Sequence, residues 1–473
     1  MNMNRFTDMD RAALLAIVPK QRALFGDEIS EDYAHDEMEG VHRLPDALIQ
    51  VTSAQEVAAV VAYCNERRIP VVTRGAGTGL VGGAVAVLGG VMLDMKLMNR
   101  ILKLDAENMT VTVEPGVLLM ELAAFADDNG FLYPPDPGEK TATIGGNIST
   151  NAGGMRAVKY GVTRDYVLSL TVVLADGSIE TFGAPTVKNS SGYSIKDLII
   201  GAEGTLGVIV EATLKLVPKP QASISMLAGF ESFSQAIAAV PKLIGSGTEP
   251  TALEFLTRRA IALTEEYLRR PFPRFQGEAA LLLTFDGGDE EEVERRTARA
   301  AELCLEHNAI DCYYVDTEER KDAVWKARGA FLEAIKASAG QLDEGDVVVP
   351  RASITSFVEQ LAPISQKAGL RVEYFGHAGD GNLHVYFCRD SMDETAWQGG
   401  LSTGFEALYD YAEQLGGMVS GEHGIGYVKQ SALYKRLGKS QMALMRRIKL
   451  AFDPNEILNP HKVYAIEELE GET

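Results

Sequence analysis

Three separated segments rich in glycine and small polar residues constrain the fold of the first 220 residues most strongly. They run from Arg74 to Gly83, from Thr143 to Gly154 and from Gly201 to Ile209. Such residues bury little apolar surface, but they let an extended backbone lie close against a flat, polar ligand. Each segment alone could be an ordinary loop. Three of them in one region predict one large ligand wrapped by several loops.

The first of these segments also matches the dinucleotide-binding pattern at Gly77, Gly79 and Gly82. In a Rossmann domain that pattern must open a helix. Here residues 84–90 lead instead into the strand-like stretch 91–95, so the sequence argues against a Rossmann domain. Two interpretations remain open for this loop: a tight structural turn, or a cradle of backbone amides for a phosphate.

Periodicity and capping signals place short helices and strands around the glycine-rich segments. We expect an N-terminal helix at 8–25, and a second helix that opens at the capping box of Ser53 and Glu56 and ends near Arg67. A further helix is expected at 118–129, and strands are expected at 69–73, 91–95, 109–113, 169–174 and 178–182.

The pattern changes after the prolines that close the stretch Leu214 to Pro220, because proline cannot continue a strand. Helical and strand-like stretches then alternate, which predicts a separate α+β domain. The helices are expected at 233–244, 291–307 and 352–369, and the strands at 280–285 and 372–375. We therefore predict three parts: residues 1–220, residues 221–415 and a C-terminal segment 416–473.

Composition excludes several classes of protein. A net charge of −21 makes nucleic acid and anionic membrane surfaces unfavourable partners. The chain has no run of about 18 apolar residues, and its acidic, polar start is unlike a signal peptide, so we expect a cytoplasmic protein. The four cysteines lack metal-cluster spacing, which predicts buried free thiols.

A second region that carries chemistry runs from Gly376 to His384 and contains two of the seven histidines. If Asp380 and Gly381 form the centre of a type I′ turn, His377 lies directly opposite His384. Both imidazoles would then share one face and could reach a single metal ion. The alternative is a solvated hairpin with two incidental histidines.

A third ligand candidate is the pair Glu422 and His423, which glycines flank on both sides. Two histidines and one carboxylate form a common set for zinc, iron or manganese that leaves positions open for substrate. The alternative is an ordinary polar pair in a loop.

The glycine-rich segments, together with Pro135 to Thr143 and the triplet Lys159-Tyr160-Gly161, resemble the FAD-binding domain of vanillyl-alcohol oxidase type flavoproteins. Over nearly its whole length the chain resembles the FAD-linked D-2-hydroxyacid dehydrogenases. These include the glycolate oxidase flavoprotein subunit, D-lactate dehydrogenases and D-2-hydroxyglutarate dehydrogenase. The resemblance implies an α+β fold with a two-part FAD-binding domain, a separate substrate (cap) domain and a C-terminal segment that returns to the flavin.

The same resemblance implies non-covalent FAD, because the first loop lacks the histidine or cysteine that links flavin covalently in some relatives. It implies that the first loop and the region after Thr143 hold the pyrophosphate, and that the region near Glu203 meets the adenine end. The residues implied to bind FAD are Arg74, Gly75, Gly77, Thr78, Gly79, Pro135, Asp136, Gly138, Thr143, Gly145, Gly146, Asn147, Thr150, Gly153, Gly154, Tyr160, Glu203, Gly204, Gly207, Ile209 and Asn459.

For the reaction, the resemblance implies that His377, His384 and Glu422 hold the metal and that His423 is the base. It also implies that Arg328 binds the substrate carboxylate. On spacing alone, Arg328 would be interpreted as a surface arginine on a helix.

One departure from the family narrows the choice of substrate, and two missing motifs narrow the choice of electron acceptor. D-2-hydroxyglutarate dehydrogenases carry a lysine about six residues before the proline that matches Pro350, whereas Glu344 stands there in this chain. A glutamate repels a second carboxylate, which favours D-lactate first and glycolate next. With no cluster cysteines and no nicotinamide fingerprint, we expect electrons to leave to an electron-transfer flavoprotein, an iron–sulfur partner subunit or a quinone-linked chain. The protein would then be peripheral to a membrane only through that partner.

Three alternatives to this function remain open. They are a non-catalytic flavin-carrying subunit of a larger oxidase, a D-2-hydroxyglutarate dehydrogenase, and an ether-lipid synthase of the same fold.

Overall fold

The computed structural model describes residues 3–38, 40–272, 276–315 and 317–464, which form two compact units. Unit 1 contains residues up to 152, residues 162–218 and the chain from 423 onward. Unit 2 contains residues 153–161 and 219–422. The predicted boundaries at 220 and 415 therefore compare with 218 and 422 in the structure. The sequence-based division placed residues 153–161 in the first part, whereas in the structure they belong to unit 2.

Unit 1 contains a four-stranded sheet in the order β1-β2-β4-β3. Its strands are β1 (Ala23–Phe25), β2 (Ala47–Gln50), β4 (Val91–Asp94) and β3 (Val71–Arg74), and both β2 and β3 run parallel to β4. Helix α2 (Ala54–Arg67) buries Val57, Val60 and Val61 in the same apolar core as these strands. Half of the predicted capping box is present: Ser53 Oγ accepts from the Glu56 N–H at 3.2 Å, whereas the Glu56 carboxylate pairs with Arg22.

A second sheet of unit 1 is antiparallel and has the order β5-β6-β10-β8-β9. The strands are β5 (Ile101–Asp105), β6 (Thr110–Val113), β10 (Val208–Lys215), β8 (Val167–Val173) and β9 (Ile179–Gly183). Strands β7 (Phe131–Leu132) and β11 (Val217–Pro218) form a separate pair, and helix α3 (Leu119–Asp128) precedes β7. The expected N-terminal helix is shorter than predicted: α1 (Asp8–Ile17) ends where Val18 and Pro19 turn the chain extended.

The glycine-rich segments differ from one another in structure. Residues 75–90 form turns and bends that lead into β4, as expected of a loop that does not open a Rossmann helix. The second segment was expected to be extended, and that prediction was wrong. It forms helix α4 (Ile144–Thr150), because Thr143 Oγ1 caps the helix by accepting from the Gly146 N–H at 3.2 Å.

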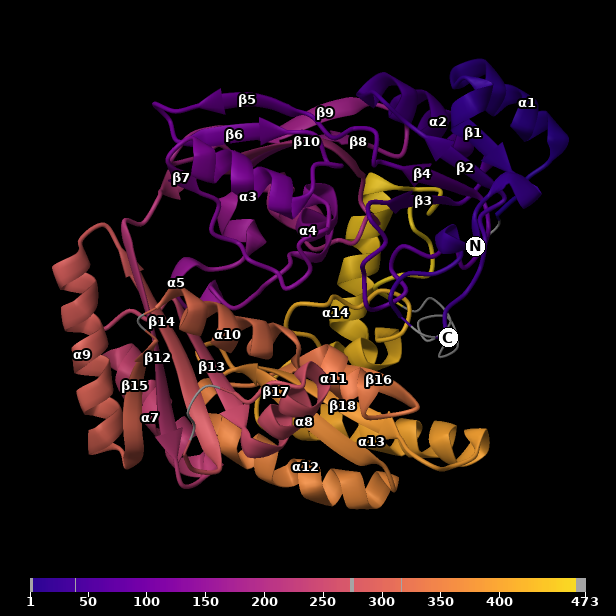
Figure 1. The fold of residues 1–473 in the computed structure, drawn as a ribbon. Helices are drawn as coiled ribbons and strands as arrows, with labels where there is room; N and C mark the ends of the chain where they lie inside the picture. Colours follow the sequence, from indigo (N-terminus) through magenta and orange to yellow (C-terminus); the bar gives the residue numbers. More distant parts are fainter. Residues whose placement is uncertain (1–2, 39, 273–275, 316, 465–473) are drawn as a thin grey trace. The chain divides into compact units, whose positions relative to one another are not determined.

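Unit 2 is built on a seven-stranded antiparallel sheet in the order β15-β12-β14-β13-β17-β18-β16 (Figure 1). The strands are β12 (Ala222–Phe230), β13 (Ala252–Thr257), β14 (Ala279–Gly287), β15 (Ala309–Val315), β16 (Gln341–Val348), β17 (Arg371–His377) and β18 (Asn382–Arg389). The expected strands at 280–285 and 372–375 are the inner parts of β14 and β17.

Helices cover both faces of this sheet. One core joins alternate strand residues such as Leu383 and Val385 to α7 (Phe233–Gly245), α9 (Glu290–Glu306), α12 (Ile354–Ala368) and α13 (Glu394–Gln414). The other core joins Phe375 and Tyr386 to α8 (Arg258–Leu268), α10 (Glu318–Gly329) and α11 (Phe331–Ala337). The α+β class expected from the sequence is confirmed.

The remaining helices are α5 (Ala157–Tyr160) in unit 2, and α6 (Ile195–Ile199) and α14 (Gln430–Phe452) in unit 1. Within the described ranges, no helix combines the length and the apolar character that crossing a bilayer requires. All four cysteines are free thiols; Cys64, Cys304 and Cys388 are buried and Cys312 is partly exposed.

Candidate active site

The histidine hairpin has a different register from the one predicted. Strands β17 and β18 are joined by four residues, 378–381, and His377 lies opposite Asn382, while Phe375 lies opposite His384. The predicted two-residue turn was therefore wrong. The two histidines still share a face, because His377 is two residues from Phe375 and side chains alternate with a period of two. Their ring centroids lie 5.4 Å apart with the planes nearly perpendicular.

Strand pairing places further polar residues on this same face. Glu254 of β13 lies opposite His377, and Asp346 of β16 lies opposite His384. Glu344, two residues from Asp346, lies opposite Tyr386. Directly opposed residues of an antiparallel pair point to the same side of the sheet. Four neighbouring strands therefore bring an unusual density of acids and imidazoles to one place.

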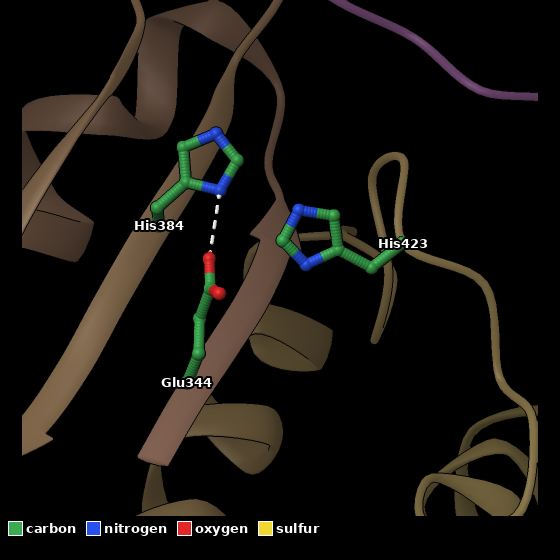
Figure 2. A group of neighbouring side chains, drawn as sticks. All are labelled: Glu344, His384 and His423. Atoms are coloured by element: carbon green, nitrogen blue, oxygen red, sulfur yellow. Dashed lines mark hydrogen bonds and ion pairs between the residues drawn. The ribbon is translucent and has the colours of Figure 1, made fainter. Parts of the chain in front are cut away.

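Each histidine is held at one ring nitrogen by a carboxylate. His377 Nδ1 lies 2.6 Å from Glu254 Oε1. Figure 2 shows the second contact, in which His384 Nδ1 lies 3.1 Å from Glu344 Oε1. The other nitrogens converge on Glu422, whose Oε1 is 3.8 Å from His377 Nε2 and 3.4 Å from His384 Nε2. Carboxylates hold metal-binding histidines in this way at one nitrogen and leave the second for the ion.

The donor set fits a divalent cation. One ligand atom from each of His377, His384 and Glu422 lies within 4.8 Å of the others, and both imidazoles are buried. Burial lowers the pKa of His377, but the carboxylates of Glu254 and Glu422 raise it by more than burial lowers it. The pKa therefore stands well above its usual value. The pKa of His384 is also raised, because Glu344 and Glu422 outweigh burial. Without a metal, the site therefore favours protons on these rings, and a cation would take their place.

Arg328 is a buried residue of α10 and not the surface arginine that spacing alone suggested. Its Nε and Nη2 donate to Glu254 Oε2 at 2.9 and 2.5 Å, and its guanidinium carbon lies 4.6 Å from the centre of the Phe375 ring. Burial raises the pKa of Glu254, but His377 and Arg328 lower it more strongly, to about 2. One ionised carboxylate thus joins the predicted substrate-binding arginine to a predicted metal ligand.

Glu254 was missed in the sequence. It carried one detectable signal, since a single acid inside the apolar stretch Ala252–Thr257 is costly unless it is paired. Asp346 and Asn382 were also missed as members of the site. Glu344 had been interpreted only as a residue that faces substrate; its carboxylate accepts from the Tyr386 hydroxyl at 2.8 Å as well as bonding His384.

The predicted base, His423, directly follows Glu422 in the chain and begins the last stretch of unit 1. Three predicted flavin residues lie in unit 2 instead of unit 1: Gly153, Gly154 and Tyr160. The Tyr160 hydroxyl donates to Asp286 of β14, which also pairs with Lys159. These contacts explain the excursion of residues 153–161 into unit 2. A Cβ on Gly153 would lie 2.8 Å from Glu422 Oε2, so this glycine permits close packing against the candidate metal ligand.

Within unit 1, the structure brings the three glycine-rich segments together. A Cβ on Gly75 would lie only 2.2 Å from Thr143 Oγ1, so the first loop lies directly against the cap of α4. The Glu203 N–H donates to the Ser149 carbonyl at 2.8 Å, which ties the third segment to the same helix. Asn459 Nδ2 donates to the carbonyl oxygens of Glu203 and Gly83, at 2.7 and 3.0 Å.

Two of the predicted flavin-binding residues use their side chains for hydrogen bonds to main-chain groups of the protein. Arg74 Nη2 donates to the Asp32 carbonyl at 2.8 Å. Gly77, with a φ of +81°, packs against the same guanidinium, since a Cβ there would lie 2.2 Å from Nη2. The Glu203 carboxylate accepts from the N–H groups of Ile425 and Gly426, at 2.7 and 2.8 Å. Both side chains shape the loops, which was not anticipated from the glycine pattern.

The other predicted flavin residues occupy the same segments. Gly77, Thr78 and Gly79 lie in the first loop; Pro135, Asp136 and Gly138 precede α4; Gly145, Gly146, Asn147 and Thr150 belong to α4; Gly204 and Gly207 precede β10, and Ile209 is its second residue.

This part of unit 1 fits a large polar cofactor. The Tyr133 hydroxyl, ten residues before the second segment, is buried without a hydrogen-bond partner among the described residues. Asp36 Oδ2, which faces Gly79, is buried and unpaired in the same described set. Buried polar atoms without partners are rare in folded proteins and point to a bound group.

Replacing Gly75 with alanine is expected to weaken FAD binding, because the added methyl displaces Thr143 Oγ1 from its capping position. The loss of such a cap costs about 1 kcal/mol, which corresponds to a roughly fivefold higher dissociation constant for FAD. Titration of FAD into apoprotein, followed by flavin fluorescence, measures the change. Gly245→Ala, in helix α7 of unit 2, is the matched control, because it lies outside the predicted FAD-binding residues and a Cβ there meets no atom within 4 Å. Equal affinities for the two variants would contradict the contact.

Comparison with known proteins identifies two known domains in this chain. A family model described as "FAD binding domain" matches residues 45–183, and one described as "FAD linked oxidases, C-terminal domain" matches residues 219–463. The chain is 50% identical over 454 residues to a D-lactate dehydrogenase of Anaerostipes hadrus, covering 94% of this chain and 95% of the relative. It is 38% identical to the glycolate oxidase subunit GlcD of Bacillus subtilis, covering 92% of each chain.

Among solved structures, p-cresol methylhydroxylase shares the fold, with a TM-score of 0.80, 20% sequence identity and 96% coverage of both chains. The fold and the matched FAD-binding domain thus define a flavoprotein of the vanillyl-alcohol oxidase type. Within that class, the chain belongs to the FAD-linked D-2-hydroxyacid dehydrogenase family, whose members are oxidoreductases.

Proposed function

We propose that this protein is an FAD- and divalent-metal-dependent dehydrogenase that oxidises a small D-2-hydroxy acid to the 2-oxo acid. The observation that carries the proposal is the convergence of two buried imidazole Nε2 atoms on Glu422, with a carboxylate holding each Nδ1. The three carboxylates in this cluster outnumber the one guanidinium, so a divalent cation offsets negative charge that burial makes costly.

The proposed roles follow from the chemistry of the residues. A cation held by His377, His384 and Glu422 would lower the pKa of the substrate hydroxyl, and FAD would accept the hydride from C2. His423, the neighbour of Glu422 in sequence, takes the hydroxyl proton. Arg328 holds the substrate carboxylate. Because Glu254 occupies the Nε–Nη2 edge of the guanidinium, the carboxylate meets the Nη1–Nη2 edge.

D-lactate is the proposed substrate, with glycolate second. The D-lactate dehydrogenase of Anaerostipes hadrus, at 50% identity, supports the first, and GlcD of Bacillus subtilis supports the second. Glu344 keeps a carboxylate beside His384, which disfavours a second substrate carboxylate there and argues against D-2-hydroxyglutarate. Because GlcD is described as a subunit, we further propose that electrons leave to a protein partner, either an electron-transfer flavoprotein or an iron–sulfur subunit.

The direct test is anaerobic mixing of the FAD-loaded protein with D-lactate, L-lactate, glycolate and D-2-hydroxyglutarate, with metal analysis of the same sample. We expect D-lactate to bleach the flavin fastest and a chelator to slow that reaction. Flavin that stays oxidised with all four acids would instead support the non-catalytic subunit.

His423→Asn is expected to keep both FAD and metal but to reduce flavin with D-lactate about 10²- to 10⁴-fold more slowly, the usual contribution of a general base. Asparagine preserves approximate size and hydrogen bonding but cannot take a proton at this pH. Stopped-flow absorbance of the flavin gives the rate. Reduction at close to the wild-type rate would remove His423 as the base.

A further inference from the structure

Asp346 is a fully buried carboxylate whose contacts lie next to the proposed metal site, and it belongs to none of the roles above. Its Oδ2 accepts three hydrogen bonds from consecutive residues: Ser420 Oγ at 2.7 Å, Gly421 N at 2.9 Å and Glu422 N at 3.0 Å. Its side chain is 0% exposed. A single oxygen atom therefore fixes the backbone of the residue that we propose as the third metal ligand.

The second oxygen of Asp346 connects the same loop to the histidine hairpin. Oδ1 accepts from Asn382 Nδ2 at 2.6 Å, and that amide also donates to the Val347 carbonyl at 2.9 Å. Asn382 lies opposite His377 on β17, and Asp346 itself lies opposite His384 on β18. Asp346 thus contacts the loop that carries the carboxylate ligand while standing in register with a strand that carries an imidazole ligand.

Packing leaves the loop little freedom around this contact. A Cβ on Gly421 would lie 2.1 Å from Asn382 Nδ2, so only glycine allows the loop to come this close. Just before it, Met418 exchanges two backbone hydrogen bonds with Val348, at 2.9 and 3.3 Å. The loop is therefore anchored to β16 at Met418 and again at residues 420–422.

Energetics favour this one arrangement of the loop. A buried carboxylate is costly unless donors satisfy it, and hydrogen bonds to a charged acceptor are the strong ones. The loop supplies three of the donors that offset the burial of Asp346, and it can do so only when the N–H groups of Gly421 and Glu422 both point at Oδ2. That conformation sends the Glu422 side chain toward the two Nε2 atoms.

We propose that Asp346 is the positioning residue of the metal site: it sets the backbone of Glu422 so that Oε1 meets His377 and His384. The inference rests on the proposed metal-dependent function. In this role Asp346 acts through its hydrogen bonds to residues 420–422, two of which come from main-chain N–H groups.

The test replaces Asp346 with asparagine and measures Co²⁺ binding to the FAD-loaded protein by its visible absorption spectrum and by competition with a chelator. An amide nitrogen in place of Oδ2 would face three donors and release the loop. We expect the Co²⁺ dissociation constant to rise about 10- to 100-fold, the range seen when a group that orients a ligand is removed. The spectrum of the remaining complex should change, while the FAD content stays at the wild-type level.

Ser420→Ala provides a graded companion, because it removes one donor and leaves both backbone N–H groups on Asp346. We expect a weaker Co²⁺ affinity that lies between those of wild type and Asp346→Asn. If Asp346→Asn does not fold, this variant decides alone, and an unchanged Co²⁺ constant would overturn the proposal. A purely structural role predicts a lower melting temperature with the wild-type Co²⁺ constant and spectrum, which also overturns it.

A His384→Ala sample measured alongside separates this inference from the proposed function. If His384→Ala loses Co²⁺ but Asp346→Asn does not, the metal site stands and the role of Asp346 is wrong. If His384→Ala binds Co²⁺ as wild type does, the proposed metal site itself is wrong.

Discussion

Replacing His384 with alanine is expected to abolish metal binding and substrate oxidation while leaving FAD bound. The variant removes one of three converging ligand atoms and leaves Glu344 without its imidazole partner. We expect metal affinity to fall by more than about 100-fold, beyond the effect of losing a group that only orients a ligand. Metal analysis after gel filtration, flavin absorbance and anaerobic reduction by D-lactate measure the three properties on one sample.

The control for this variant is His307→Ala. His307 follows helix α9 in the same unit and is outside the group of ligand atoms around Glu422. The His307→Ala variant should keep its metal, its FAD and its activity. The proposed division, with FAD in unit 1 and the metal ligands in unit 2, predicts that His384→Ala keeps its flavin. Loss of FAD together with the metal would contradict that division.

Lys449→Met is expected to destabilise unit 1 strongly. Lys449 Nζ is buried and donates to Asp453 at 2.6 Å and to the carbonyl oxygens of Thr205 and Leu458, at 2.6 and 2.7 Å. Methionine fills similar space but leaves the fully buried Asp453 carboxylate without its cation. Breaking a buried pair in this way costs about 3–5 kcal/mol of unfolding free energy.

Thermal and urea unfolding, followed by circular dichroism, measure this loss. At about 2–4 °C for each kcal/mol in a domain of this size, the melting temperature should fall by roughly 6–20 °C. The double variant Lys449→Met/Asp453→Asn should recover part of it, because the unpaired charge is gone. No recovery would show that the three donor contacts of the lysine, and not the charge of Asp453, dominate its contribution.

The same contacts connect stability to the flavin. Lys449 holds Leu458, which precedes Asn459, and Asn459 binds the carbonyl oxygens of Glu203 and Gly83. Lys449→Met is therefore also expected to release FAD at a lower temperature than wild type. Flavin fluorescence during the same thermal scan reports this release.

Local sequence features predicted much of the fold because they depend on near neighbours. The Ser53 cap, the proline-terminated strand before Lys219 and the apolar stretches within β14 and β17 each involve residues close in sequence. Two predictions of local structure were wrong. Residues 144–150 formed a helix although glycine and β-branched residues disfavour one, and the N-terminal helix ended early at Val18 and Pro19.

The hairpin shows why an incorrect register still led to the correct face. The prediction paired His377 with His384, whereas the structure pairs Phe375 with His384. This is a slip of two residues, and side chains on a strand repeat every two residues, so both rings stayed on one face. A slip of one residue would have placed them on opposite sides of the sheet.

By itself, then, the sequence determined which residue types stand in which short segment: glycine-rich loops for a flavin, two histidines on one face of a hairpin, and an acid beside a third histidine. The tertiary structure decided the partner of each group. Arg328 and Glu254 are 74 residues apart, and Glu254 and His377 are 123 apart. Asp346 and Glu422 are 76 apart. Such pairs follow from the order and register of β13, β17, β18 and β16, and no local pattern encodes register between strands that are distant in the chain.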